Sequence, residues 1–139
     1  MKKSYIFEKG FTVIELLVTI AIIGLLASIV LVSIGSARSK GWDGKTQNQL
    51  SDLRSAATLY QHNNNTYDIC AAPSSDTTGV YSMRQSSNYN GQTVTCNSTS
   101  VAWAVGVPLV ASSGYYWCVD SRGASEKNAG SLGVATVCP

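Results

Sequence analysis

The chain has 139 residues, of which 45% are hydrophobic and 13% charged, and its formal net charge is +2. This length allows one domain, and so small a domain buries a modest core that usually needs covalent cross-links. Residues 1–10 hold three lysines and one glutamate, which leaves seven basic and seven acidic side chains in the remainder. This balance argues against a nucleic-acid-binding protein, because such proteins depend on a basic surface.

Residues 1–10 are short and hydrophilic, and they end at Gly10. Residues 11–34 follow as an apolar run in which Glu15 is the only charged residue. A helix over this run would be about 36 Å long, enough to cross the roughly 30 Å hydrocarbon core of a bilayer. A carboxylate in such a helix costs about 2.5–3.5 kcal/mol at the membrane centre and less near an interface. Glu15 therefore either lies in the headgroup layer or has a partner.

The small residue lies before the apolar run, whereas a secretory signal peptide carries its small-residue cleavage site after the run. The stretch Lys-Gly-Phe-Thr-Val-Ile-Glu-Leu-Leu-Val at 9–18 closely resembles the processing site of type IV prepilins and pseudopilins. The resemblance implies that a prepilin peptidase cleaves after Gly10 and methylates the new N-terminal amine of Phe11. It also implies that Glu15 meets the N-terminal ammonium of a neighbouring subunit in a filament, which favours one axial register.

The same resemblance implies a path from the membrane to a filament. Before assembly the chain would cross the inner (cytoplasmic) membrane once, with its N-terminus in the cytoplasm and its head outside. Its partners would be the prepilin peptidase/methyltransferase, an inner-membrane assembly platform, and further copies or other pilins in a cell-surface or periplasmic filament. Most family members carry a proline about two-thirds along this helix, whereas the first proline here is Pro73. That departure leaves pilin and pseudopilin both open.

Residues 35–62 are predicted to continue the helix as a stalk with an amphipathic second half. Gly41 and Gly44 each cost a helix roughly 1 kcal/mol relative to alanine, so local weakness is expected there. Apolar side chains then recur at intervals of three and four residues and predict a stripe that packs on a sheet: Leu50, Leu53, Ala57 and Tyr60. Three asparagines at 63–65 are expected to end the helix.

Trp42 and His62 of this region each allow a purely structural interpretation as well as a functional one. Trp42 lies where the chain would leave the membrane, and tryptophan is favoured at such interfaces, but it would equally pack on the head. His62 is the only histidine, and no second histidine or metal-ligand spacing accompanies it. We therefore interpret His62 as exposed or structural.

Residues 63–139 are predicted to form a globular head. Residues 66–100 are rich in Ser, Thr, Asn and Gly and are expected to be mostly loop, with one short helix at 79–87. Strands are expected at 101–110, with Pro108 placing its end near a sheet edge, and at 114–120, 124–127 and 132–137. A helix with an apolar face followed by strands predicts an α+β fold, in which a small antiparallel sheet packs on the long helix.

The four cysteines, at 70, 96, 118 and 138, all follow the apolar run. None belongs to a C-x-x-C pair, which argues against zinc ligation. An even number in a small exported domain predicts two disulfides, for which three connectivities are possible. The favoured pairing is Cys70–Cys96 with Cys118–Cys138, which would staple the loop-rich segment and the C-terminal segment separately. The second bridge also resembles the C-terminal disulfide loop of many pilins.

Nothing in the sequence supports catalysis, and no cofactor is predicted. The acidic residues after position 60 are scattered, no serine has a nucleophile-elbow pattern, and no glycine-rich phosphate loop follows a strand. Some pseudopilins bind calcium through oxygen atoms of C-terminal loops. In this chain Asp120 and Glu126 would be the candidate ligands. Two carboxylates in a polar turn are usually solvated, so no metal site is predicted.

The resemblance thus implies a structural subunit of a type IV pilus-like filament, serving adhesion, twitching motility or DNA uptake, and not an enzyme. One alternative is a pseudopilin of a type II secretion system. Another, of a different class, is a membrane-tethered binding module that never polymerises, which would tolerate Glu15→Ala. The expected parts are a leader, a transmembrane and filament-core helix, a stalk and a disulfide-bonded head, at 1–10, 11–34, 35–62 and 63–139.

Overall fold

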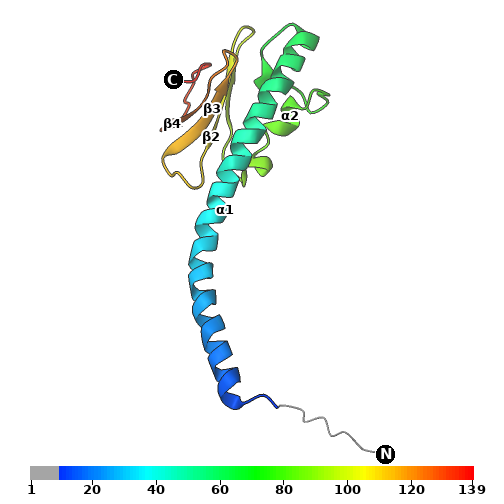
Figure 1. Ribbon diagram of the computed structural model, residues 1–139. Helices are drawn as coiled ribbons and strands as arrows, with labels where there is room; N and C mark the ends of the chain where they lie inside the picture. The colour runs from blue at the N-terminus through cyan, green and yellow to red at the C-terminus, as the bar shows by residue number, and fades with distance from the viewer. Residues whose placement is uncertain (1–9) are drawn as a thin grey trace, which may run out of the picture. The chain divides into compact units, whose positions relative to one another are not determined.

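The computed structural model describes residues 10–139, so the predicted leader lies outside the described residues except for Gly10. The described chain divides into two compact units, one ending at Ser36 and one comprising Ala37–Pro139. Helix α1 (Val13–Asn64) contributes residues to both units (Figure 1).

The first unit contains the apolar part of α1, and residues 11–36 are exposed throughout. By length and composition, α1 is the one helix within residues 10–139 that is able to cross a membrane. Hydroxyl side chains along the run donate hydrogen bonds to backbone carbonyls three or four residues earlier, which satisfies them without water: Thr19, Ser28 and Ser33.

The second unit has the predicted α+β architecture. Its sheet is antiparallel, with strand order β1-β2-β3-β4. The strands are β1 (Thr95–Ser98), β2 (Trp103–Pro108), β3 (Tyr115–Asp120) and β4 (Ser125–Ala129). Between α1 and the sheet in sequence lie three short helical turns: η1 (Ile69–Ala71), α2 (Val80–Met83) and η2 (Ser86–Tyr89).

The main core lies between one face of the sheet and the C-terminal half of α1. The predicted apolar stripe of α1 is confirmed, since all four of its residues are buried in this core. The sheet contributes alternate residues of its two central strands: Trp103, Val105, Val107 and Val119. Burying each such side chain stabilises the fold by about 1.5–3 kcal/mol, so this seam holds the helix on the sheet. Val80 of α2 and Tyr89 of η2 complete the core.

A second, smaller core covers the opposite face of the sheet. Ala104 and Tyr116 point to this side, where Leu132 from the C-terminal segment packs over them. The fit is close at Gly106, because a Cβ atom there would lie 2.9 Å from Tyr116 Cδ2 and 3.0 Å from Leu132 Cβ. We call residues 130–138 the C-terminal strap. The two central strands are therefore buried on both faces, by α1 on one and by the strap on the other.

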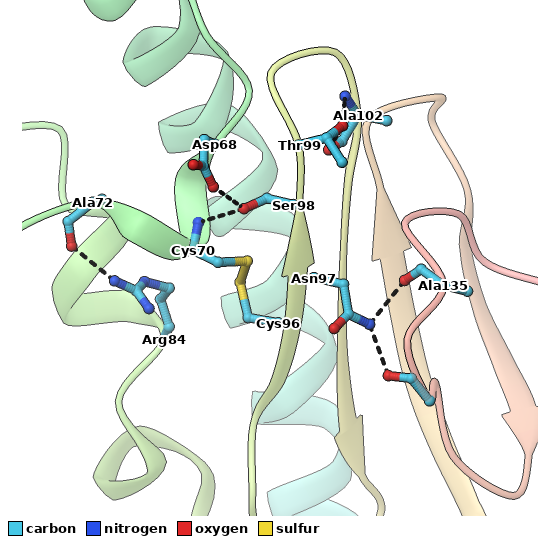
Figure 2. The surroundings of a disulfide bond; sticks show 11 residues. Asp68, Cys70, Ala72, Arg84, Cys96, Asn97, Ser98, Thr99, Ala102 and Ala135 are labelled. Carbon is cyan, nitrogen blue, oxygen red and sulfur yellow. Dashed lines mark hydrogen bonds between the residues drawn. A yellow bond between two sulfur atoms is a disulfide. The ribbon is translucent and has the colours of Figure 1, made fainter.

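The strap is fastened by side chains. Cys138 is bonded to Cys118 of β3, and its N–H donates to Asp120 Oδ2 at 3.0 Å. Figure 2 shows the second attachment, in which Asn97 of β1 points toward the strap. Its Nδ2 donates two hydrogen bonds, at 2.8 and 2.9 Å, to strap carbonyls: those of Gly133 and Ala135.

The sheet differs from the sequence prediction in two places. Residues 132–137 form no strand, because they are held by Asn97 and the disulfide instead of a backbone ladder, and Gly133 turns the chain with a φ of +60°. Conversely, β1 lies in the region expected to be loop. Its sequence, Thr-Cys-Asn-Ser, has little intrinsic strand preference, so its conformation is set by pairing with β2.

β2 is an interior strand, and Pro108 is its last residue. β1 pairs with β2 only as far as Gly106, so the missing N–H of Pro108 removes no bond from that ladder. The strands predicted at 101–110, 114–120 and 124–127 are thus present with shifted ends.

Helix α1 continues without a break through Gly41 and Gly44. Between them, the Asp43 side chain is buried, and its carboxylate accepts hydrogen bonds from the N–H groups of Val110 at 2.6 Å and Ala111 at 3.2 Å. These charge-assisted bonds tie the helix to the segment after β2 and stabilise it where its own propensity is low.

The helix ends agree in part with those predicted from the sequence. α1 ends at Asn64, and Asn65 has a φ of +52°, the left-handed conformation expected of an asparagine after a helix. The short helix expected at 79–87 is present as two pieces, α2 and η2. His62 is exposed, as interpreted.

Candidate assembly site at the start of the helix

Thr12 and Glu15 form a capping box at the start of α1. The Thr12 N–H and hydroxyl donate to Glu15 Oε2 at 2.9 and 2.7 Å, and the Glu15 N–H donates back to Thr12 Oγ1 at 3.3 Å. The two side chains thereby satisfy N–H groups that the first helical turn leaves without partners. Thr12 is a site residue that the sequence predictions missed, although the spacing Thr-x-x-Glu is the signature of this motif.

The capping box does not neutralise the charge of Glu15. Within residues 10–139, the hydrogen bonds to this carboxylate come from Thr12 and all end on Oε2, which leaves Oε1 open. The side chain lies on a helix whose neighbouring residues are apolar and exposed. An unpaired carboxylate in such surroundings favours a cation as its partner once water is excluded.

Gly10 and Phe11 lie just before the capping box and have no regular secondary structure. Phe11 is 81% exposed, and within the described residues no atom outside its chain neighbours lies within 4 Å of the position that a Cβ would take at Gly10. The peptide bond between them is therefore accessible, as a cleavage site must be. An amine created at Phe11 would lie one residue before the capping threonine.

The head carries two disulfides, and their pairing is the one favoured from the sequence. Cys70–Cys96 and Cys118–Cys138 have Cα–Cα distances of 5.8 and 5.9 Å. Around the first bridge, the Cys70 N–H donates to Ser98 Oγ at 3.1 Å, and the Ser98 hydroxyl donates to Asp68 (Figure 2). These bonds tie η1 to β1 and give the polar side chains of this region a structural role.

The two acidic residues considered for calcium do not form a site. Asp120 is 1% exposed, and its carboxylate accepts the N–H groups of Arg122 and Ala124 at 2.9 Å as well as that of Cys138. The interpretation of Asp120 as a solvated carboxylate is therefore wrong, because it organises a turn and the strap. Glu126 is exposed on β4. No group of three His, Cys, Asp or Glu side chains that is able to hold a metal ion occurs in the part of the chain that the structure describes.

Comparison with known proteins points to one family of relatives. A model of the prokaryotic N-terminal methylation motif matches residues 7–35. The type IV wide pilus major component PilA4 of Thermus thermophilus is 41% identical over 59 residues, which is 42% of this chain and 45% of that protein. The type II secretion system core protein G of Pectobacterium carotovorum is 35% identical over 60 residues, which is 43% of this chain and 38% of that protein.

A longer match is found to the type IV major pilin protein PilE1 of Neisseria gonorrhoeae, which is 33% identical over 100 residues. That match covers 68% of this chain and 56% of the relative. The chain thus spans about half the length of the curated relatives that it matches. No solved structure matches it significantly. The matched motif and these relatives support the family of type IV prepilins and pseudopilins, and an apolar helix followed by a disulfide-bonded α+β head agrees with it.

Proposed function

We propose that the protein is a structural subunit of a type IV pilus-like filament and polymerises through the N-terminal part of α1. Prepilin peptidase cleaves it after Gly10 and methylates the amine of Phe11. Before assembly it crosses the cytoplasmic membrane once, with the head outside, and an inner-membrane assembly platform then transfers it to the filament. It acts as a building element and not as an enzyme.

One observation carries this proposal. Glu15 is the only charged residue of the exposed apolar run 11–34, and within residues 10–139 its Oε1 atom accepts no hydrogen bond. The N-terminal ammonium of a neighbouring subunit is a cation that such a helix bundle would bring to it. Each charge would be costly alone in an apolar bundle, so pairing favours the one register that joins them.

A pseudopilin of a type II secretion system is the second candidate. It is supported by the similarity to the core protein G of Pectobacterium. Deletion of the gene would distinguish the two candidates. A pilin predicts loss of surface fibres with secretion intact, whereas a pseudopilin predicts the accumulation of secreted proteins in the periplasm.

The intact mass of the membrane-extracted protein tests the processing step. We expect a species that lacks residues 1–10 and carries one added methyl group. A Gly10→Leu variant should keep its full-length mass, because the peptidase recognises the small residue before the cut. A full-length mass for the protein without substitutions would contradict the proposal and favour the membrane-tethered module.

Three variants separate the charge of Glu15 from its role as a cap. Glu15→Gln keeps a side chain suited to a capping box but has no charge, whereas Thr12→Val removes the cap and keeps the charge. We expect Glu15→Gln to abolish filaments, Thr12→Val to reduce them modestly, and the control Ser28→Ala to leave them unchanged, as counted by electron microscopy. Normal filaments from Glu15→Gln would show that the carboxylate is only a cap.

A further inference from the structure

We propose that Arg38, Lys40, Trp42 and Lys45 form a basic collar that binds the anionic phospholipid headgroups of the leaflet from which the head emerges. The collar comes directly after the apolar run that would cross the membrane. Its three cations are exposed and Trp42 is half-buried. The inference rests on residues 11–34 crossing a membrane, but it does not depend on polymerisation.

The charge of the chain is concentrated at the collar. Although residues 11–139 are formally neutral, residues 35–45 hold three cations and one acid, and residues 46–139 hold four cations and five acids. The single acid of the collar segment, Asp43, points into the head and binds the backbone N–H groups of Val110 and Ala111. The exposed charges of this segment are therefore all positive, which suits an anionic partner.

Three of the four collar residues share one side of the helix. Arg38, Trp42 and Lys45 are spaced by four and three residues, which places them on neighbouring positions of successive turns. The Lys45 ammonium lies 4.6 Å from the centroid of the Trp42 ring. Tryptophan with adjacent cations is the combination that proteins use at the membrane–water interface, where the ring and the ammonium contact headgroups together.

Chain length keeps the first collar cations close to the membrane. Arg38 and Lys40 follow Ile34 by four and six residues in one α-helix, whose rise of about 1.5 Å per residue puts them about 6 and 9 Å beyond the end of the apolar run. Their long side chains extend toward headgroups while their stems stay on apolar surface. An anionic leaflet attracts such cations within a Debye length, which is about 8 Å at physiological ionic strength.

Anionic lipid is favoured over the other anionic partners. Nucleic acid would need a larger basic surface than three cations provide. An acidic protein surface fits the charge, but Trp42 and the adjoining apolar run match a bilayer and its interface. The collar would hold the unassembled subunit at a fixed depth and would have to be released when the subunit leaves the membrane.

The test measures the lipids around the full-length chain reconstituted in phosphatidylcholine bilayers. Electron paramagnetic resonance compares the immobilised fraction of spin-labelled phosphatidylglycerol with that of spin-labelled phosphatidylcholine. Because leader lysines also attract anionic lipid, every chain carries the background substitutions K2Q, K3Q and K9Q. The collar variant adds R38Q, K40Q and K45Q, and the matched control adds R122Q, which removes an exposed cation outside the collar.

We expect the background chain to prefer phosphatidylglycerol by about fivefold, the ratio that one cation near an anionic surface provides. The preference should disappear in the collar variant and in about 1 M salt, and it should persist in the R122Q chain. Near-ultraviolet circular dichroism checks that each head is folded. The proposal is overturned if the background chain shows no preference, if the collar variant keeps it, or if R122Q removes it equally. Loss of filaments from a collar variant that keeps its lipid preference would identify the collar as a protein interface.

Discussion

Asp43 and Asp120 are buried carboxylates that bind backbone N–H groups from segments distant in the sequence. Asp43 holds the segment after β2 against α1, and Asp120 holds the strap at Cys138. Hydrogen bonds to a charged group contribute about 1.5–3 kcal/mol each, more than those between neutral groups. Two side chains therefore fix the relation of α1, the sheet and the strap within the head.

Replacement of Asp43 tests this role. Asp43→Ala should lower the free energy of unfolding of the head by about 1–3 kcal/mol, because the N–H groups of Val110 and Ala111 lose their acceptor. Urea unfolding of the detergent-solubilised protein, followed by tryptophan fluorescence, measures the change. Asp52→Ala, at an exposed acid of the same helix, is the control and should stay within about 0.5 kcal/mol of the parent. Equal effects of the two substitutions would contradict the assignment.

Tyr89 makes the stability of the head depend on alkaline pH. Burial raises the pKa of Tyr89 from 10.0 to about 12, and its hydroxyl donates to the Met83 carbonyl at 2.7 Å. The neutral phenol is thus favoured in the folded state. Its contribution is fully present below the unfolded pKa of 10.0 and is lost as the pH rises through about 12.

The free energy of unfolding should therefore fall between about pH 10 and 12, and Tyr89→Phe should reduce the slope because phenylalanine does not ionise. Denaturant unfolding at a series of pH values measures the slope. Tyr115→Phe serves as the matched control, since Tyr115 is 43% exposed. An unchanged slope in Tyr89→Phe would mean that other groups cause the alkaline loss.

Among the elements, those with a strong periodic pattern could be predicted from the sequence. The local sequence pattern predicts the burial of the apolar stripe of α1. It also predicts β2 and β3, which are rich in apolar, β-branched and aromatic residues. β1 and the strap could not be predicted. Both have polar or short sequences whose conformation depends on contacts with β2, Asn97 and Cys118, which lie elsewhere in the chain.

Two glycines of different elements predict opposite effects of an added methyl group. Gly106→Ala should destabilise the head by about 1–3 kcal/mol, because its Cβ would collide with Tyr116 and Leu132 between β2 and the strap. Gly41→Ala in α1 meets nothing within 4 Å and should stabilise the helix by about 0.5–1 kcal/mol. Thermal unfolding of both variants and the parent protein shows whether each substitution raises or lowers the melting temperature. A neutral Gly106→Ala would mean that the strap does not lie tightly on the sheet.

At the scale of the whole molecule, the charged residue of the candidate site could be predicted from the sequence, but the threonine that caps it was not. Glu15 stands out because it is alone in an apolar run, whereas Thr12 is noticed only when the capping pattern is sought. The role of Asp43 could not be inferred, since its partners are 67 and 68 residues away. A long-range contact between a helix and a loop leaves no periodic trace in the sequence.

The two disulfides should contribute strongly to the stability of the head. Bridges that close loops of 26 and 20 residues contribute about 3 kcal/mol each in the chain-entropy model. Alkylation of the unfolded protein should modify no cysteine before reduction and four after it, as counted by mass spectrometry. Cys70→Ser with Cys96→Ser, and separately Cys118→Ser with Cys138→Ser, should each lower the unfolding free energy. Any thiol that is reactive before reduction would contradict the pairing.

Each cysteine is bonded to its neighbour in sequence, so a head that crosses the membrane in sequence order, as the proposed topology requires, would present bridging partners in order. Cys70 and Cys96 emerge as a complete pair before Cys118 appears, and neither bridge requires a later exchange of partners. The face of the sheet that the strap covers is completed later, because all four strands emerge before Leu132 and Cys138. During that interval Tyr116 and the thiol of Cys118 are uncovered. If the head is exported as proposed, the arrival of the strap determines how long it remains open to aggregation and to mispaired disulfides.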